Sequence, residues 1–136
     1  MLRTAILSAV LILGSQTLAF AQDKCANPDD QQTTTECADL SFNKSDKQLN
    51  DIYKQIEGRL SDDADTRKLL GQAQRAWIKF RDAECDFKSS ASAGGTARPM
   101  IVAICEDGIT QSRIKDLQAY LKCEEGALDC PVPVGK

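Results

Sequence analysis

The sequence contains no histidine among its 136 residues, and aromatic side chains make up only 5% of it. The absence of histidine excludes Ser-His and Cys-His nucleophile pairs, an imidazole general base and every metal site that needs a histidine ligand. Basic residues are outnumbered, 17 against 20 acidic ones, so charge gives no support for binding nucleic acid. The sequence therefore predicts no cofactor, no metal site and no nucleic-acid partner.

Long apolar runs are also missing. The run over residues 5–14 is about half the length that a bilayer span requires. It follows Arg3 and leads to an A-F-A sequence ending at Ala21, an order typical of a signal peptide cleaved after Ala21. No cysteine follows that site directly, because Cys25 is the first one. We therefore expect residues 1–21 to be a signal peptide, and the product to be periplasmic or secreted, without a membrane anchor.

Hydrophobic spacing after the signal peptide is helical. A first helix is expected after a T-x-x-E capping box from Thr33 to Glu36, since residues 36–57 contain no glycine or proline and Gly58 weakens only its last turn. Its apolar positions recur every three or four residues: Leu49, Ile52, Tyr53, Ile56 and Leu60. A second helix is expected over about residues 63–88, and its apolar stripe comprises Leu69, Leu70, Ala73, Trp77, Phe80 and Phe87.

The remainder of the chain predicts shorter elements. Residues 89–95, rich in serine and glycine, indicate a flexible break. Thr96 can cap a third helix, Gly108 is expected to interrupt it, and Thr110 can cap a final stretch. The expected fold is all-α, an antiparallel helical hairpin with one or two further helices, stapled by disulfides. The domain spans residues 22–122, and an irregular tail covers residues 123–136.

Six cysteines in a chain this short predict disulfides, since there is no C-x-x-C pair to suggest redox or metal chemistry. A hairpin that turns near Asp62 places four of them at one pole. Two bridges are expected there, with all three pairings open, among Cys25, Cys37, Cys85 and Cys105. Cys123 and Cys130, seven residues apart, most simply close a local loop.

An ordered set of motifs lies within the two expected long helices and the segment after them. In chain order they are D-x-x-L-N-x-x-Y (46–53), A-Q-R-A-W-x-x-F-R-D-A-E-C (73–85), G-G-T (94–96), Cys105 and T-x-x-R (110–113). Over about residues 25–122 this set resembles the LprI-like family, which takes its name from a mycobacterial lipoprotein that inhibits lysozyme. The resemblance implies a lysozyme inhibitor that acts by binding another protein. The chain departs from the founding lipoprotein because it has no lipobox.

Several motif residues are polar and share helical faces. Spacings of three and four place Asn50 beside Tyr53 on the first helix, and Gln74, Trp77 and Arg81 in one row on the second. With Arg113 they are expected to form a partly buried polar cluster that sets how the helices pack. A ligand site on the same face and direct contact with lysozyme are the alternatives.

No motif for catalysis is present, and the carboxylates are expected to cap helices, pair with cations or face water. We therefore predict a periplasmic lysozyme inhibitor that is not an enzyme. The candidate contact with a basic lysozyme is the acidic turn of Asp62, Asp63 and Asp65. The alternative is a non-catalytic accessory or ligand-binding helical module with another envelope partner.

Overall fold

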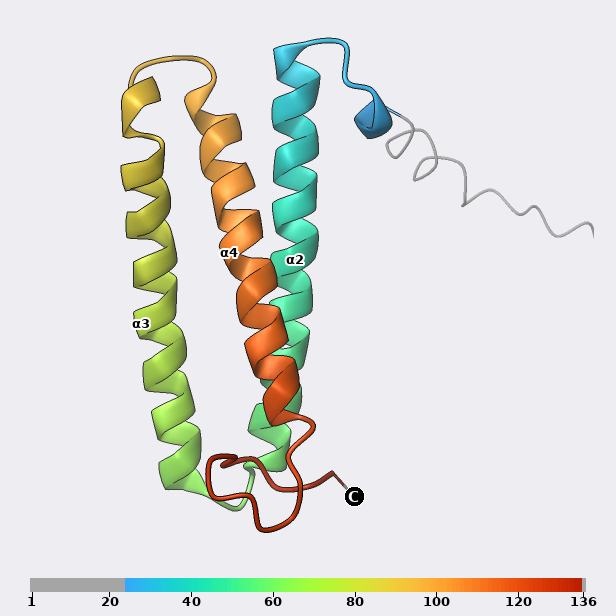
Figure 1. Cartoon of the computed structure of the whole chain (residues 1–136), viewed down its shortest axis with the longest axis vertical. Coiled ribbons are helices and arrows are strands. Elements are labelled where there is room, and N and C mark those ends of the chain that lie inside the picture. The colour runs from blue at the N-terminus through green and yellow to red at the C-terminus, as the bar shows by residue number, and fades with distance from the viewer. Residues whose placement is uncertain (1–23, 136) are drawn as a thin grey trace, which may run out of the picture.

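The computed structural model describes residues 24–135, so the predicted signal peptide lies outside the described residues. Three long helices run side by side: α2 (Gln31–Arg59), α3 (Ala64–Lys88) and α4 (Arg98–Tyr120). A short 3-10 helix, η1 (Ser90–Ser92), stands in the connection between α3 and α4. In Figure 1, α2 and α4 run in the same direction and α3 runs opposite to both. Residues 24–135 contain no strand, and the predicted all-α fold is confirmed.

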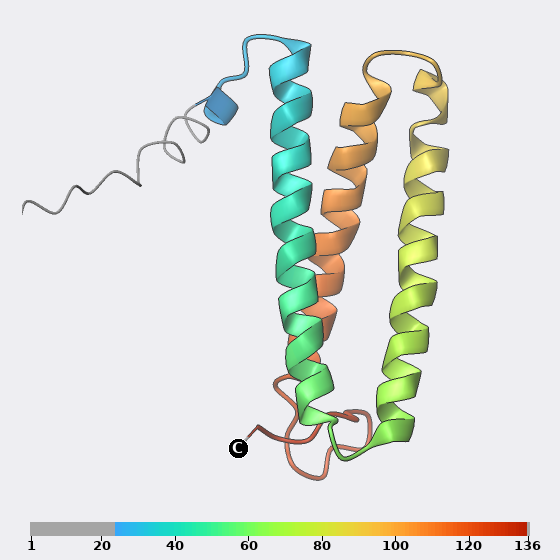
Figure 2. The ribbon, with the colours of Figure 1, turned by 180° about the vertical axis from the view of Figure 1, so that it is seen from behind.

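The hydrophobic core lies mainly between α2 and α4, which in Figures 1 and 2 converge towards the pole that contains the α2–α3 turn. Half of the buried core residues are apolar positions that the spacing predicted on the first helix. The core comprises Leu49, Ile52 and Ile56 from α2 with its C-cap residue Leu60, Ile114 and Leu117 from α4, and Cys123 and Val132 from the tail. Nearer the pole where α4 begins, the small residues Ala38 of α2 and Ala103 of α4 are also buried. There, Ser41 and Ser45 of α2 donate hydrogen bonds to Asp107 of α4.

Helix α3 stands at the edge of the bundle and packs mainly on α4. Only Gln74 and Cys85 are fully buried on it, while Leu70 and Trp77 pack half-buried against the core. The predicted single apolar stripe is therefore wrong in part. Leu69, Phe80 and Phe87 are exposed by 63%, 57% and 75%, because they lie on a different face from Leu70 and Trp77.

The start of α2 differs from the predicted capping box. The helix begins at Gln31, and Asp30 is its N-cap, accepting a hydrogen bond of 2.7 Å from the backbone N–H of Thr33. Thr33 lies within the first turn and donates its hydroxyl to the same carboxylate. An aspartate is at least as good an N-cap as a threonine. Asp30 therefore caps the helix in place of Thr33, and the helix is about one turn longer than predicted.

Helix α4 is continuous, which corrects three expectations. Its N-cap is Ala97 without a side-chain hydrogen bond, so Thr96 does not cap it. Gly108 does not interrupt it, and Thr110 lies in its buried interior and caps nothing. One glycine costs a helix only about 1 kcal/mol. The core contacts of Ile114 and Leu117 and the disulfide at Cys105 hold the helix on both sides of that position.

Replacing Gly108 with alanine should stabilise the protein by about 0.5–1 kcal/mol. A Cβ atom built at this exposed helical position meets no atom within 4 Å. Chemical denaturation of Gly108→Ala beside the wild type measures the gain. Gly94→Ala is the matched control and should destabilise, because Gly94 has a φ of 75°. A Gly108 variant that loses stability would contradict an open environment at this position.

The three disulfides pair Cys25 with Cys37, Cys85 with Cys105 and Cys123 with Cys130. The predicted local loop at Cys123 and the predicted pairing among the other four are thus confirmed. Four cysteines gather at the pole away from the α2–α3 turn, as the hairpin geometry required. Of the three open pairings, the structure selects the one that ties the N-terminal segment to α2 and α3 to α4.

The tail after α4 folds back over the pole that contains the α2–α3 turn. Val132 is buried in the core, and the guanidinium of Arg59 donates to the carbonyl oxygen of Leu121 at 2.9 Å and to that of Pro133 at 3.5 Å. One cation from α2 therefore holds both the end of α4 and the tail. Within residues 24–135, no helix combines the length and apolar character needed to cross a membrane.

Candidate functional site

The motif residues of α3 and α4 form a stacked cluster beside the core. Two guanidinium groups lie over the ring of Trp77, that of Arg81 at 5.4 Å and that of Arg113 at 6.0 Å from the ring centre. Arg113 also donates through Nε to the side-chain oxygen of the buried Gln74 at 3.3 Å. These four predicted residues are brought together, and the indole and guanidinium planes join α3 to α4 by packing as well as by charge.

Arg81 has only 11% of its side chain exposed. It forms ion pairs with Asp82 at 2.8 Å and Asp46 at 3.5 Å. It also lies over the ring of Phe42, 5.1 Å from the ring centre. Sequence reasoning did not include Phe42, although it stands four residues before Asp46, the first residue of the α2 motif, and so shares its face. Arg81 thus links α3 to α2, two helices that otherwise touch little.

The other two predicted members lie elsewhere. Asn50 is exposed and donates to Asp46 at 3.0 Å, so it orients a partner of Arg81 without joining the stack. Tyr53 is half-buried against the core near Gly71 of α3, where an added Cβ would lie 3.5 Å from the tyrosine hydroxyl. Burial raises the pKa of Tyr53, and the nearby carboxylate of Glu57 raises it further.

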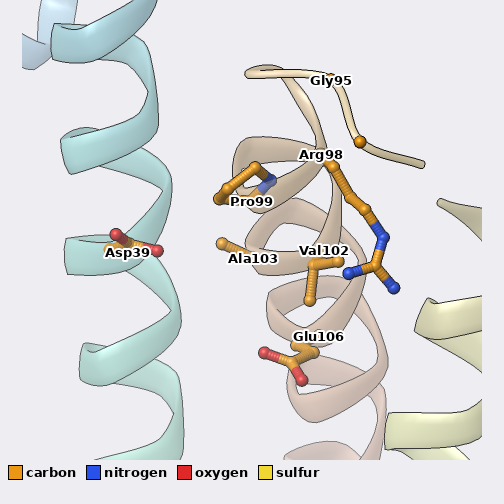
Figure 3. A pocket seen from close by; sticks show the side chains of 8 residues that line it. Asp39, Gly95, Arg98, Pro99, Val102, Ala103 and Glu106 are labelled. Atoms are coloured by element: carbon orange, nitrogen blue, oxygen red, sulfur yellow. The ribbon is translucent and has the colours of Figure 1, made fainter. Parts of the chain in front are cut away.

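A shallow groove lies next to this cluster, between α2 and the first turns of α4 (Figure 3). Pro99, Val102 and Ala103 form its apolar part, and Asp39 and Glu106 bring carboxylates to it from opposite helices. Burial raises the pKa of Glu106, as do nearby carboxylates, while Arg81 opposes that shift. The groove thus combines a carboxyl group that takes up a proton more readily than usual with an apolar wall.

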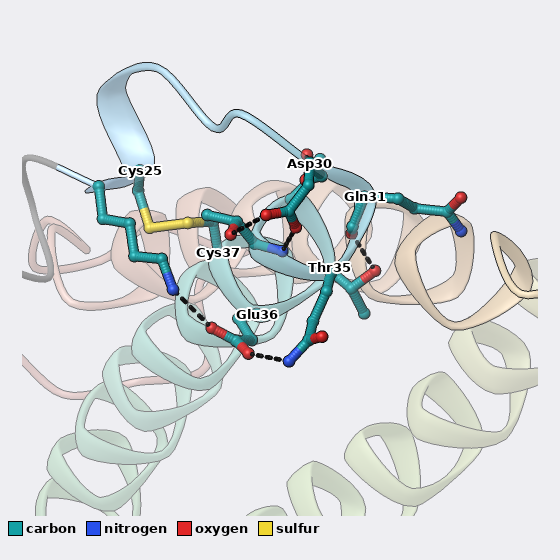
Figure 4. A network of polar contacts seen from close by, with 10 residues as sticks. Cys25, Asp30, Gln31, Thr35, Glu36 and Cys37 are labelled. Carbon is teal, nitrogen blue, oxygen red and sulfur yellow. Dashed lines mark hydrogen bonds and ion pairs between the residues drawn. A yellow bond between two sulfur atoms is a disulfide. The ribbon is translucent and has the colours of Figure 1, made fainter.

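The N-terminal segment is fastened to the first turns of α2 by a small polar network (Figure 4). Glu36 accepts from Lys24 at 3.3 Å and from Gln32 at 3.1 Å, next to the Cys25–Cys37 disulfide. The lysine ammonium and the amide of Gln32 lower the pKa of Glu36, with the amide contributing most. All three side chains are exposed, so the disulfide is the main restraint on this segment.

The predicted acidic turn contains three exposed carboxylates with different roles. Asp63 is the N-cap of α3 and accepts from the backbone N–H of Thr66 at 2.9 Å, which holds its pKa below the usual range. Asp65 lies in the first turn of α3, and Asp62 accepts only from the hydroxyl of the neighbouring Ser61. Asp62 and Asp65 are therefore free to meet a partner.

The turn is not isolated at its pole, because the C-terminal tail lies against it. A groove there is lined by Gln55, Gly58, Arg59, Ser61, Asp62 and Asp63 on one side and by Pro133, Val134 and Gly135 on the other. Glu124 and Glu125 line an adjoining hollow formed by the tail itself. We name this combined surface the turn–tail surface. Sequence reasoning found its turn but missed its tail, because the tail is placed by the long-range contacts of Arg59 and Val132.

Neither surface has the ligands of a metal centre. Among residues 24–135, no three cysteine, aspartate or glutamate side chains gather in an arrangement suited to a metal ion. All six cysteines are in disulfides. What both surfaces offer is charge and apolar contact, which suit the binding of another molecule.

These features define a small disulfide-linked helical protein with charged binding surfaces. More narrowly, the chain belongs to the lysozyme inhibitor LprI family, whose sequence model matches residues 23–117. It is also similar to the uncharacterized protein R02472 of Rhizobium meliloti (strain 1021), with 28% identity over 138 residues, 91% of this chain and 99% of that protein. No solved structure matches the chain.

Proposed function

We propose that this protein is exported to the periplasm or beyond, where it binds and inhibits a basic lysozyme without catalysing a reaction. The observation that carries this proposal is membership of the lysozyme inhibitor LprI family over most of the chain. Three disulfides agree with an oxidising compartment. The signal peptide over residues 1–21, cleaved after Ala21, would deliver the chain there.

The turn–tail surface is the contact that we propose for lysozyme. Asp62 on this surface and Asp65 in the neighbouring first turn of α3 are exposed without a cationic partner among the described residues. Glu124 and Glu125 are exposed on the adjoining tail. By contrast, Arg81 and Arg98 neutralise part of the acidic charge at the opposite pole. An exposed acidic surface speeds association with a basic protein and orients it before contact.

The double variant Asp62→Lys/Asp65→Lys should inhibit lysozyme about tenfold more weakly than the wild type, and its inhibition should depend less on salt. The reversal replaces attraction by repulsion at two exposed positions, while Asp63 still caps α3. The measurement is the clearing of a bacterial cell-wall suspension by a basic lysozyme, titrated with each protein at several salt concentrations.

Asp29→Lys/Asp116→Lys is the matched control, since it makes the same change in net charge at exposed positions outside the turn–tail surface. Equal weakening by both variants would show that net charge alone drives binding and would refute the proposed surface. Wild-type protein that leaves several lysozymes fully active would refute inhibition. The accessory module would then be the better account.

A further inference from the structure

Helix α3 carries a second apolar face that belongs neither to the groove between α2 and α4 nor to the turn–tail surface. Its members alternate at spacings of four and three residues along the helix: Leu69, Ala73, Ala76, Phe80, Ala83 and Phe87. All six are exposed. We call this row the α3 seam. At 3.6 residues per turn its members fall within about 80° of the helix circumference, so they form one continuous stripe.

The seam is distinct from the face by which α3 joins the bundle. That inner face comprises Leu70, Gln74, Trp77, Arg81 and Cys85, which contact the core, α2 or α4. All six seam residues are exposed, and Figures 1 and 2 show α3 at the edge of the bundle. The seam is therefore an unpartnered face within residues 24–135.

The spacing of the seam is the one by which helices pack on other helices. Alternation of four and three residues repeats every seven, which places apolar side chains at the a and d positions of a coiled coil. The row spans 18 helical intervals, about 27 Å at 1.5 Å per residue. A stripe of this length, ending in a phenylalanine exposed by 75%, is unusual on the surface of a monomer.

We propose that the α3 seam is a homodimer interface, in which α3 of a second copy packs antiparallel against it. In that orientation small and large residues complement each other at the centre of the seam. Aligned about a two-fold axis level with Ile78, Phe80 of each copy faces Ala76 of the other. Ala73 then faces Ala83, and Leu69 faces Phe87, so that a large side chain meets a small one at the centre and the same contacts occur twice.

A parallel pair would fill the same space poorly. It would place Phe80 against Phe80 and Ala76 against Ala76. Layers with two large side chains would then alternate with layers that leave a cavity between small ones. The antiparallel pair instead sets each central Phe80 ring against Ala76 of the other copy, while each Phe87 ring packs against Leu69. Four phenylalanine rings would bury on the order of 500 Å², about half of the ~1,000 Å² that marks a specific interface. Leu69, the alanines and the stems of flanking side chains supply the rest.

The charges beside the seam distinguish the two orientations. Lys79 flanks the seam close to the proposed two-fold axis, so the antiparallel pair brings two Lys79 ammonium groups near each other. A parallel pair would set Lys79 opposite Glu84 of the second copy. The antiparallel dimer should therefore tighten as salt screens the repulsion, and Lys79→Gln should tighten it about twofold. A parallel dimer should weaken in both cases.

Sedimentation velocity of the purified protein over a wide range of concentration tests the interface. We expect a monomer–dimer equilibrium in the wild type. Phe80→Glu should weaken the dimer at least tenfold, because it places a charge in the centre of the seam. Ile104→Glu is the matched control, with a similar exposure of 54% on α4, and should dimerise like the wild type. Far-ultraviolet circular dichroism of each variant verifies folding.

Three outcomes would overturn the proposal. One is a monomer at every concentration, and another is equal weakening by Phe80→Glu and Ile104→Glu. The third is a monomer whose Phe80→Glu variant loses inhibition of lysozyme, which would make the seam the surface for that partner. The proposal does not rest on lysozyme inhibition, so a dimer that inhibits nothing would leave it standing.

Discussion

Removing the Cys85–Cys105 disulfide by a double alanine substitution is expected to lower the free energy of unfolding by about 3 kcal/mol. The bridge closes a loop with a sequence separation of 20 residues, and the chain-entropy account assigns a loop of that size about this value. Cys85 is also one of only two fully buried side chains of α3. Urea denaturation of the variant and the wild type measures the loss.

The position of α3 predicts where that loss should appear. Because α2 and α4 share most of the core, hydrogen exchange should show α3 amides losing protection first while α2 and α4 stay protected. The Cys25→Ala/Cys37→Ala variant is the control, since its disulfide ties the N-terminal segment to α2 and should leave α3 protected. Equal loss of protection in all three helices would contradict an edge position for α3.

Replacing Trp77 with alanine is expected to lower the free energy of unfolding by about 3 kcal/mol, the lower end of the range for large aromatic side chains. The indole is half-buried against the core, and its loss removes the surface on which Arg81 and Arg113 stack. Leu40→Ala is the control, because Leu40 is exposed by 54% on α2 and should lose little stability. Denaturant unfolding measures both variants.

The same variant separates a structural role of the cluster from a binding role. If the cluster sets helix packing, Trp77→Ala should lose stability, and it should still inhibit lysozyme under conditions where it remains folded. A variant that unfolds like the wild type and yet no longer inhibits would refute the structural interpretation. It would identify the stack of Trp77, Arg81 and Arg113 as the contact with the partner.

Local sequence signals predicted the helices well and their ends less well. The spacing of Leu49, Ile52 and Ile56 located the buried face of α2, because periodicity depends only on helix geometry. The caps were harder to assign. Asp30 and Thr33 both carry acceptors, and which one ends the non-helical segment depends on backbone angles that the sequence does not show.

Some residues of the candidate site could likewise be predicted from the sequence, and others could not. Gln74, Trp77, Arg81 and Arg113 could be grouped from their motifs and spacing, and they do meet. Phe42 and the tail could not be foreseen as their neighbours. Phe42 reaches Arg81 only because α2 lies at a particular angle to α3, and the tail reaches the turn only because Arg59 and Val132 hold it there.

The sequence by itself determined an all-α chain with a hairpin whose poles are set by equal helix lengths, and therefore which cysteines can meet. It could not determine which face of α3 turns inward. That helix carries two apolar rows about 100° apart, one through Leu70 and Trp77 and one through Leu69, Phe80 and Phe87. Both satisfy a helical period, so hydrophobicity does not separate them. The tertiary structure decided between them because Cys85 and Arg81 lie on the first face, and their bonds to Cys105 and Asp46 turn it towards α4 and α2.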